Sequence, residues 1–424
     1  MSLRLALALA ATGLLAISAQ ANWTHFRGSK SNGTAAEPVP QEFGEGKNVA
    51  WKVPLPGRGL SSPIVVGDKL FLTASTGTNN DRLHVLAFDA GSGKQLWERS
   101  FWATGPTASH PKTNMAAPTP ASDGKHVVAL FATDDLVCLD LDGNVKWVRS
   151  LYEENQGATD GRGLASSPII INGTIVVQID TQNVAFCAGV DITTGANRWR
   201  KERAKEINWS SPIILPGRNP GEELALIQGS KKLAAVDPQT GAEIWALEME
   251  CDPIASSVVA GKVLYVPAGE KGMTAFELQG AAPPKQLWQQ RRIVPVTSSP
   301  VVVKDRIYCV RGGRLVSADI KNGEPAGNLR LSGAISSSLV VAGGLIYCFD
   351  EQGTAFVIQP DEKDGKLLQK NTLGKTPPAS ESAAAPGAGR PAGDVESILC
   401  TPALANGAMY VRSDKHLWKI AKGS

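Results

Sequence analysis

Polar side chains that could bind a ligand are concentrated in a few short stretches of the chain. The segment SHPKTN places His110, Lys112 and Asn114 within five residues. An imidazole, an ammonium group and an amide can together hold an anion by charge and hydrogen bonds. In QIDTQN, Asp180 follows an apolar run, where its carboxylate could accept a hydrogen bond from a ligand or satisfy its own turn. These residues indicate binding chemistry, and we assign no catalytic residue.

Basic and aromatic residues elsewhere extend this set. Arg203 and Trp209 lie close together in the sequence, and arginine with tryptophan is a common combination at binding hot spots. Arg58, Arg162 and Arg292 stand in other polar stretches. We therefore treat all of these residues as candidate binding residues, with the alternative that each is a satisfied loop residue.

Several function classes lack their motifs. The chain has no GxSxG and no phosphate-binding glycine loop, and its five histidines include no HxxxH pair, so we predict no metal ligand. A formal net charge of +3 in 424 residues is too small for a nucleic-acid-binding chain. The six cysteines lie mostly in apolar runs, which favours buried thiols over disulfides.

The first residues resemble an export signal. Arg4 precedes the apolar run LALALAATGLLAI, and Ala19-Gln20-Ala21 is a small-x-small cleavage site. We expect a signal peptide over residues 1–21, without the cysteine that a lipid anchor needs. The mature chain should be periplasmic or secreted, and it should not span the membrane because the apolar run is short.

One phrase recurs along the chain and indicates its architecture. Its copies are AFDAGSGKQLW, CLDLDGNVKW, GVDITTGANRW, AVDPQTGAEIW and, more loosely, AFELQGAAPPKQLW. The closing tryptophans are 50, 52, 46 and 43 residues apart, which is the length of one four-stranded propeller blade. We expect them, with the equivalent residue near the N-terminus, to dock neighbouring blades: Trp51, Trp97, Trp147, Trp199, Trp245 and Trp288.

A second phrase, SSP or a close variant, marks eight starts. Each precedes a short β-branched run, and small side chains suit an innermost strand near a crowded axis. The last unit, from Cys400, contains only three strands, while AWKVPLP before the first unit is an unattached strand. We therefore predict an all-β, eight-bladed propeller of four-stranded antiparallel blades, closed by this N-terminal strand in the last blade.

Residues 48–424 then form one propeller domain. Residues 22–47 are an N-terminal extension that we expect to pack across the outside of a blade. Residues 374–396, rich in Pro, Ala and Gly, are expected to be a flexible insertion between the last two blades.

In this architecture the loops between blades share one face, and six of the eight are basic. We expect either a ring of positive charge that attracts an anionic partner or merely solvated charge at strand ends. The basic residues, in order along the chain, are Arg58, His110 with Lys112, Arg162, Arg203 with Lys205, Arg291 with Arg292, and Arg330.

The repeated AxDxxTGxxxW phrase resembles the tryptophan-docking repeat of pyrroloquinoline quinone (PQQ) propellers, over almost the whole mature chain. That superfamily includes quinoprotein dehydrogenases and the BamB-like envelope scaffolds. For a dehydrogenase, the resemblance implies PQQ and calcium at the axis, with carboxylate ligands and adjacent cysteines. The chain has no Cys-Cys pair and no run with a calcium ligand set.

We therefore expect an exported, monomeric and non-catalytic binding or scaffold protein, with an envelope protein or a small or anionic ligand as partner. Two alternatives stay open: a PQQ-dependent oxidoreductase, and a propeller that binds a polyanion or carbohydrate at the basic face.

Overall fold

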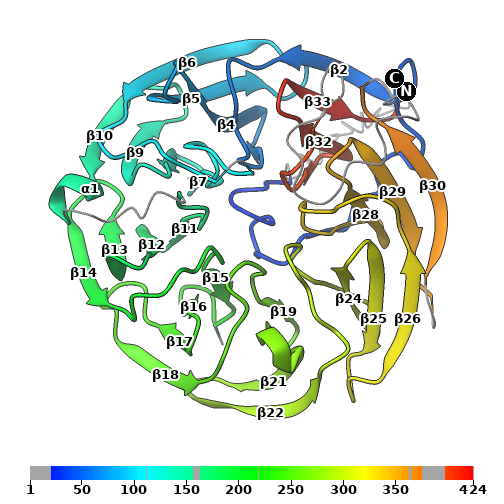
Figure 1. The fold of residues 1–424 in the computed structure, drawn as a ribbon. Helices are drawn as coiled ribbons and strands as arrows, with labels where there is room; N and C mark the ends of the chain where they lie inside the picture. The colour runs from blue at the N-terminus through cyan, green and yellow to red at the C-terminus, as the bar shows by residue number, and fades with distance from the viewer. Residues whose placement is uncertain are drawn as a thin grey trace, which may run out of the picture.

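The computed structural model describes residues 21–110, 112–155, 163–217, 219–361, 365–374 and 397–423. In this part of the chain, eight sheets surround a central axis (Figure 1). The predicted eight-bladed propeller is confirmed. The signal peptide, apart from Ala21, and residues 375–396 of the expected insertion lie outside the described residues.

Each blade runs from the axis outward as four antiparallel strands. The innermost strands are β3 Ile64–Val66, β7 Ala121–Ser122, β11 Ile169–Ile171, β15 Ile213–Leu215, β19 Val258–Ala260, β23 Val301–Val303, β27 Val340–Ala342 and β31 Ala403–Ala405. The second strands are β4 Lys69–Thr76, β8 His126–Leu130, β12 Thr174–Asp180, β16 Leu224–Gln228, β20 Val263–Pro267, β24 Arg306–Arg311, β28 Leu345–Phe349 and β32 Ala408–Arg412.

The two outer layers complete the blades. The third strands are β5 Arg82–Asp89, β9 Asp135–Asp140, β13 Ala185–Asp191, β17 Lys232–Val236, β21 Met273–Gln279, β25 Arg314–Asp319, β29 Thr354–Gln359 and β33 His416–Ile420. The outermost strands are β6 Gln95–Trp102, β10 Val145–Ser150, β14 Asn197–Glu202, β18 Glu243–Glu248, β22 Ala282–Gln290, β26 Pro325–Arg330, β30 Lys366–Thr372 and β2 Val49–Pro54.

We number the blades 1 to 8 in the order of their innermost strands. Three short elements lie outside this plan: β1 (Thr34–Ala35), α1 (Leu151–Glu154) and the 3₁₀ turn η1 (Gly269–Lys271). None of the described helices is long and apolar enough to cross a bilayer.

The ring closes between the two ends of the chain. Strand β2 pairs antiparallel with β33, with Val49 opposite Ile420 and Pro54 opposite His416. This N-terminal strand supplies the outermost strand of blade 8, as predicted. Closure covers the edge that β33 would otherwise expose to pairing with another chain.

The repeated tryptophans contact the next blade in a common geometry. The indole N–H donates to a carbonyl oxygen in the neighbouring blade at 2.8–3.0 Å in five cases: Trp51 to Gly91, Trp97 to Leu141, Trp147 to Ile192, Trp199 to Pro238 and Trp288 to Ile320. The ring lies against the glycine of that blade's turn. At Gly195 an added Cβ would be 2.7 Å from Trp147 Cδ2, and φ is +74°, so a side chain there is excluded twice.

The aspartate of the phrase shapes the same turn. The Asp191 carboxylate accepts the backbone N–H groups of Thr193 and Thr194, both at 2.9 Å. The backbone N–H groups of such a turn have no partner on a neighbouring strand, so the aspartate carboxylate accepts their hydrogen bonds. Trp245 differs from the others: it is buried in an apolar cluster with Leu264 and Phe276 of blade 5, whose copy of the phrase has Glu277 in place of the aspartate.

Candidate functional site

The axis of the propeller contains a small pocket lined by one hydroxyl residue from each blade. Each SSP-like start supplies it, as its second residue in six blades, as the first residue of Ser256-Ser257-Val258 in blade 5, and as the residue after Ala116-Ala117-Pro118 in blade 2. The eight ring residues are Ser62, Thr119, Ser167, Ser211, Ser256, Ser299, Ser338 and Thr401. The pocket has a volume of about 140 Å³. It opens on the face that carries the loops between blades, which we call the inter-blade face.

These hydroxyl groups form a closed ring of hydrogen bonds. The backbone N–H of each ring residue donates to the hydroxyl oxygen of its counterpart in the next blade, at 2.9–3.1 Å, and Thr401 donates back to Ser62. All eight residues are buried. The small size of these residues was predicted from crowding, whereas their hydrogen-bonding role was missed. The signal for it was the recurrence of hydroxyl residues at one position of the repeat.

The floor of the pocket comes from the N-terminal extension, which lies inside the channel and not outside a blade as we expected. Trp23 pairs with Val65 of β3 in blade 1, and β1 pairs in parallel with β27 of blade 7, two positions away in the ring. Between these contacts the chain turns below the hydroxyl ring, and Phe26 lines the pocket. Figure 1 shows this segment as a dark blue trace inside the ring.

The expectation was wrong because residues 22–47 lack the repeat pattern of a blade, so nothing in their spacing showed which surface they cover. Their later part does reach blade 7, where Phe43 lies 6.3 Å from Phe349 between ring centroids and Val39 O accepts a hydrogen bond from the Tyr347 hydroxyl at 3.1 Å. We call residues 22–35 the axial plug. It fills the channel below the hydroxyl ring.

Two polar residues of the axial plug are buried without an acidic partner. Arg27 is 1% exposed and donates to the carbonyl oxygens of Ser257, Asn32 and Pro300. Burial lowers the pKa of Arg27 to about 9. His25 hydrogen-bonds to the hydroxyl groups of Thr24 and Ser31, both at 3.1 Å, and burial lowers its pKa to about 4. The sequence-based site did not include either residue.

The SHPKTN loop connects blade 1 to blade 2 on the inter-blade face. His110 is exposed there, and its ring nitrogen accepts the backbone N–H of Lys112 at 3.1 Å. Asn114 is buried, and its carbonyl group accepts the N–H of Ala116 at 2.9 Å. Its amide nitrogen has no hydrogen-bond partner within the described part of the chain.

Lys112 forms an ion pair with a residue of a distant blade on the inter-blade face. Its ammonium group lies 3.0 Å from both carboxylate oxygens of Glu351, which belongs to blade 7. Blades 2 and 7 are three positions apart in the ring, so this ion pair links loops of two distant blades on the inter-blade face. Exposed pairs of this kind contribute little to stability, about 0–1 kcal/mol, so the contact can open easily.

Asp180 and Arg203 form a buried ion pair. Arg203 Nε lies 2.7 Å from Asp180 Oδ1, with side-chain exposures of 13% and 3%. Burial by itself would lower the pKa of Arg203, but the charge and hydrogen bonds of Asp180 outweigh it and raise that pKa. Gln178 and Asn208 donate to the same carboxylate at 2.7 and 3.2 Å. This network joins the second strand of blade 3 to the loop that follows the blade.

Trp209 is half-buried at the rim of the axial pocket. Its indole N–H donates to the carbonyl oxygen of Gly163 at 2.9 Å, and its backbone N–H donates to Pro253 O at 2.6 Å. The pairing of Trp209 with an exposed Arg203 is therefore not what the structure contains: Arg203 faces Asp180, while Trp209 lies over the pocket.

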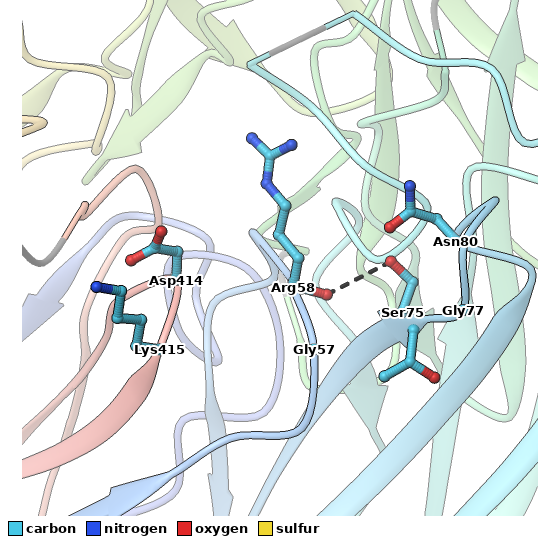
Figure 2. A pocket seen from close by; sticks show the side chains of 8 residues that line it. Gly57, Arg58, Ser75, Gly77, Asn80, Asp414 and Lys415 are labelled. Atoms are coloured by element: carbon cyan, nitrogen blue, oxygen red, sulfur yellow. Dashed lines mark hydrogen bonds between the residues drawn. The ribbon is translucent and has the colours of Figure 1, made fainter. Parts of the chain in front are cut away.

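A second hollow lies on the same face, between blades 1 and 8. This groove of about 510 Å³ is lined by Arg58, Asn80, Asp414 and Lys415 among others. Figure 2 shows the Arg58 side chain extending into the open side of the groove, while its backbone pairs with Ser75. The groove is wider and more open than the axial pocket.

The basic residues predicted on the inter-blade face do not form one continuous ring of positive charge. Arg292 is exposed, and Arg162 lies outside the described residues. Since Lys112 pairs with Glu351 and Arg203 with Asp180, two of the predicted positive positions are neutralised locally. The inter-blade face is thus a polar surface with scattered positive groups, and the most regular site on it is the hydroxyl ring.

The residues at the axis do not fit calcium-bound PQQ. Drug-sized ligands occupy pockets of roughly 300–1,000 Å³, and the axial pocket measures about 140 Å³. None of the described residues that line it is a carboxylate, which calcium requires. In the described chain, no group of three or more His, Cys, Asp and Glu side chains is arranged to hold a metal ion. All six cysteines are buried free thiols.

Comparison with known proteins places this fold in a family. A family profile described as "Outer membrane protein assembly factor BamB" matches residues 44–219, 188–362 and 281–394. A protein of that name from Burkholderia pseudomallei (strain K96243) is 26% identical over 191 residues, or 45% of this chain and 42% of the relative. The match thus spans about two fifths of the length of that relative.

Two solved structures share the fold at low sequence identity. BamB from Moraxella catarrhalis superposes with a TM-score of 0.60 and 16% identity, covering 88% of this chain and 96% of the other. Quinohemoprotein alcohol dehydrogenase from Comamonas testosteroni gives a TM-score of 0.65 and 11% identity, covering 95% and 81%. Since the family profile matches most of the chain, the protein belongs to the family of PQQ-like propellers described as outer membrane protein assembly factor BamB.

Proposed function

We propose that this protein is a non-catalytic scaffold of the cell envelope that binds another protein on its inter-blade face. The observation that carries this proposal is the axial plug. Phe26 and the hydroxyl ring leave about 140 Å³ at the axis, where a quinoprotein would need room for its cofactor. This supports a scaffold over a quinoprotein, because little room is left at the axis, where the resemblance to quinoproteins implies a cofactor.

Family membership supports the same reading. The profile and the Burkholderia relative are both described as an outer membrane protein assembly factor, a role in which one protein acts on others. The signal-like residues 1–21 support export to the envelope. The inter-blade face is suited to binding a protein because its loops carry the exposed side chains of His110 and Arg292. These loops also surround the rim of the axial pocket at Trp209.

A first experiment separates this scaffold from a PQQ-dependent oxidoreductase. The purified protein is heated with and without PQQ and calcium, and dye-linked dehydrogenase activity is measured in parallel. A ligand that binds the folded state must raise the melting temperature. The scaffold proposal expects no saturable rise and no activity. A saturable rise together with activity would replace it with the oxidoreductase.

A second experiment tests the location of the protein partner. A photoreactive amino acid replaces Arg292 on the inter-blade face, and a matched variant places it at Lys262, in the turn between β19 and β20 on the opposite face. We expect a discrete crosslinked protein only from position 292. Charge reversal at Arg162 and Arg292 should weaken it. Equal crosslinking from both positions, or no effect of charge reversal, would contradict binding at this face.

A further inference from the structure

The hydroxyl ring presents hydrogen-bond donors that no other group in the described chain uses. A serine or threonine hydroxyl can donate one hydrogen bond and accept two. Each ring oxygen accepts a backbone N–H from the neighbouring blade, but no acceptor for its own proton occurs among the described residues. The same holds for the other four members. Eight buried O–H groups therefore line one pocket with their protons available.

The surroundings of the pocket are positively charged. Arg27 donates to the carbonyl oxygens of Ser257 and Pro300, the residues that directly follow ring members Ser256 and Ser299. Arg412, also 1% exposed, donates to the backbone and hydroxyl oxygens of Ser61, the residue before ring member Ser62. In the described chain no hydrogen bond joins a carboxylate to either guanidinium group, but the negative charge of Asp414 lies close enough to Arg412 to act against the lowering of its pKa by burial.

Two buried aspartates near the pocket are satisfied within their own turns. Asp252 and Asp350 are buried on the same face, but their carboxylates accept backbone N–H groups of their own turns, from Ile254 and Ala255 and from Gln352 and Thr354. Neither aspartate lines the pocket, and the Arg27 and Arg412 side chains act from just outside its lining as well. Burial raises the pKa of both carboxyl groups.

We propose that the axial pocket binds a tetrahedral oxyanion such as phosphate or sulfate through the hydroxyl ring, with Arg27 and Arg412 supplying the balancing charge. A cation is disfavoured because the two buried guanidinium groups hydrogen-bond to residues that directly flank ring members. The volume suits an oxyanion: at about 30 Å³ for each water-sized group, 140 Å³ holds about four to five such groups. Four of them correspond to the oxygens of the ion.

Access is through the inter-blade face. The Lys112–Glu351 pair lies on this face and is solvent-exposed on the lysine side. Oxyanion binding at the axial pocket is a property of the isolated protein. It does not depend on whether a protein partner docks on the inter-blade face.

The test fills the pocket without altering its hydrogen bonds. Ala165 lines the rim and is replaced by leucine, while the control variant, Ala282→Leu, adds the same side chain to the exposed strand β22. The full chain is melted in a chloride buffer with increasing sodium phosphate or sodium sulfate at constant ionic strength. Because sulfate stabilises proteins in general, the A165L variant also measures that background.

The expected result is a saturable rise in melting temperature for the wild-type and Ala282→Leu proteins, roughly 3 °C at a hundredfold excess over Kd. The Ala165→Leu variant should show only the unsaturable background. Arg27→Met should bind at least about tenfold more weakly, since it removes a charged partner. If that variant does not fold, the Ala165→Leu comparison still decides.

Three results would overturn the proposal. The first is an equal response of the wild-type and A165L proteins to the oxyanions. The second is a saturable rise with potassium or calcium chloride in place of the oxyanions. The third is an equal saturable rise with an uncharged polyol such as glycerol, which would show that the ring binds hydroxyl compounds regardless of charge.

Discussion

Replacing Gly195 with alanine should destabilise the propeller by separating two blades. Gly195 lies in the outer turn of blade 3, against the indole ring of Trp147 from blade 2. A suitable control lies in the same blade. Gly173 has nearly the same φ, +75° against +74°, but an added Cβ there meets nothing closer than 3.9 Å. The two substitutions thus share the backbone strain and differ in the contact with tryptophan.

The magnitudes follow from these two contributions. A left-handed conformation costs a residue with a Cβ about 1–2 kcal/mol, which applies to both variants. At Gly195 the new Cβ would lie 2.7 Å from Trp147 Cδ2, so the indole must move. Overpacking of this kind costs typically about 1–3 kcal/mol. The indole also risks losing its 2.9 Å hydrogen bond to Ile192 O, worth about 1 kcal/mol.

Thermal unfolding followed by circular dichroism measures the difference. With an unfolding entropy of about 2.1 cal/mol/K per residue, a change of 1 kcal/mol shifts Tm by roughly 1–2 °C in a chain of this size. We expect Gly173→Ala to lower Tm by about 1–2 °C and Gly195→Ala by about 3–6 °C. Tryptophan fluorescence should change only in the second variant.

A double-mutant cycle shows whether the contact itself is responsible. In a Trp147→Ala background, Gly195→Ala should cost no more than Gly173→Ala, since the ring that it displaces is gone. Equal Tm losses for the two glycine variants in the wild-type background would refute the argument that the tryptophan phrase docks one blade on the next.

Three further predictions concern ring closure, the buried ion pair and pH. Deleting residues 48–56 removes β2 and should open the ring, seen as a lower Tm and dye binding to exposed apolar surface; an unchanged melting curve would contradict closure by β2. Asp180→Asn should cost about 3–5 kcal/mol in urea unfolding because it buries the Arg203 charge alone, whereas Asp191→Asn at the more exposed pair with Arg198 should cost about 1 kcal/mol or less. Burial lowers the pKa of His25 from 6.5 to about 4, so the unfolded chain binds a proton at a higher pH than the folded chain does. The free energy of unfolding should therefore fall by up to about 3 kcal/mol as the pH drops from about 6.5 to 4. His25→Gln should flatten this pH dependence in melting scans, and an unaltered pH dependence would show that other groups cause it.

Much of the architecture could be predicted because the sequence motifs that indicate it occur in several blades. The Trp-ending phrase and the SSP starts recur at blade length, so each copy confirmed the others. The missing outer strand in the last unit and the spare strand at Ala50–Pro56 then indicated closure. The structure agrees, with β2 in blade 8.

The site was harder to predict because it depends on contacts between distant parts of the chain. Glu351 neutralises Lys112 from blade 7, and Arg27 reaches carbonyl groups in the fifth and sixth blades; no local spacing reports either contact. The axial plug occurs once, so no repeat could reveal its position. Ring members such as Ser167 were visible, but a buried hydroxyl group and a merely small side chain look alike in one sequence.

The axial plug also constrains the order in which the molecule can assemble. Residues 22–35 leave the ribosome before any blade, yet in the finished molecule they are enclosed by the inner strands of blades made later, including β27. The closing strand β2 cannot pair until β33 has been synthesised, because Val49 pairs with Ile420. Such sequence separations make folding slow. The blades must therefore gather around a segment already present at the axis, and the molecule stays an open arc until its last strands arrive.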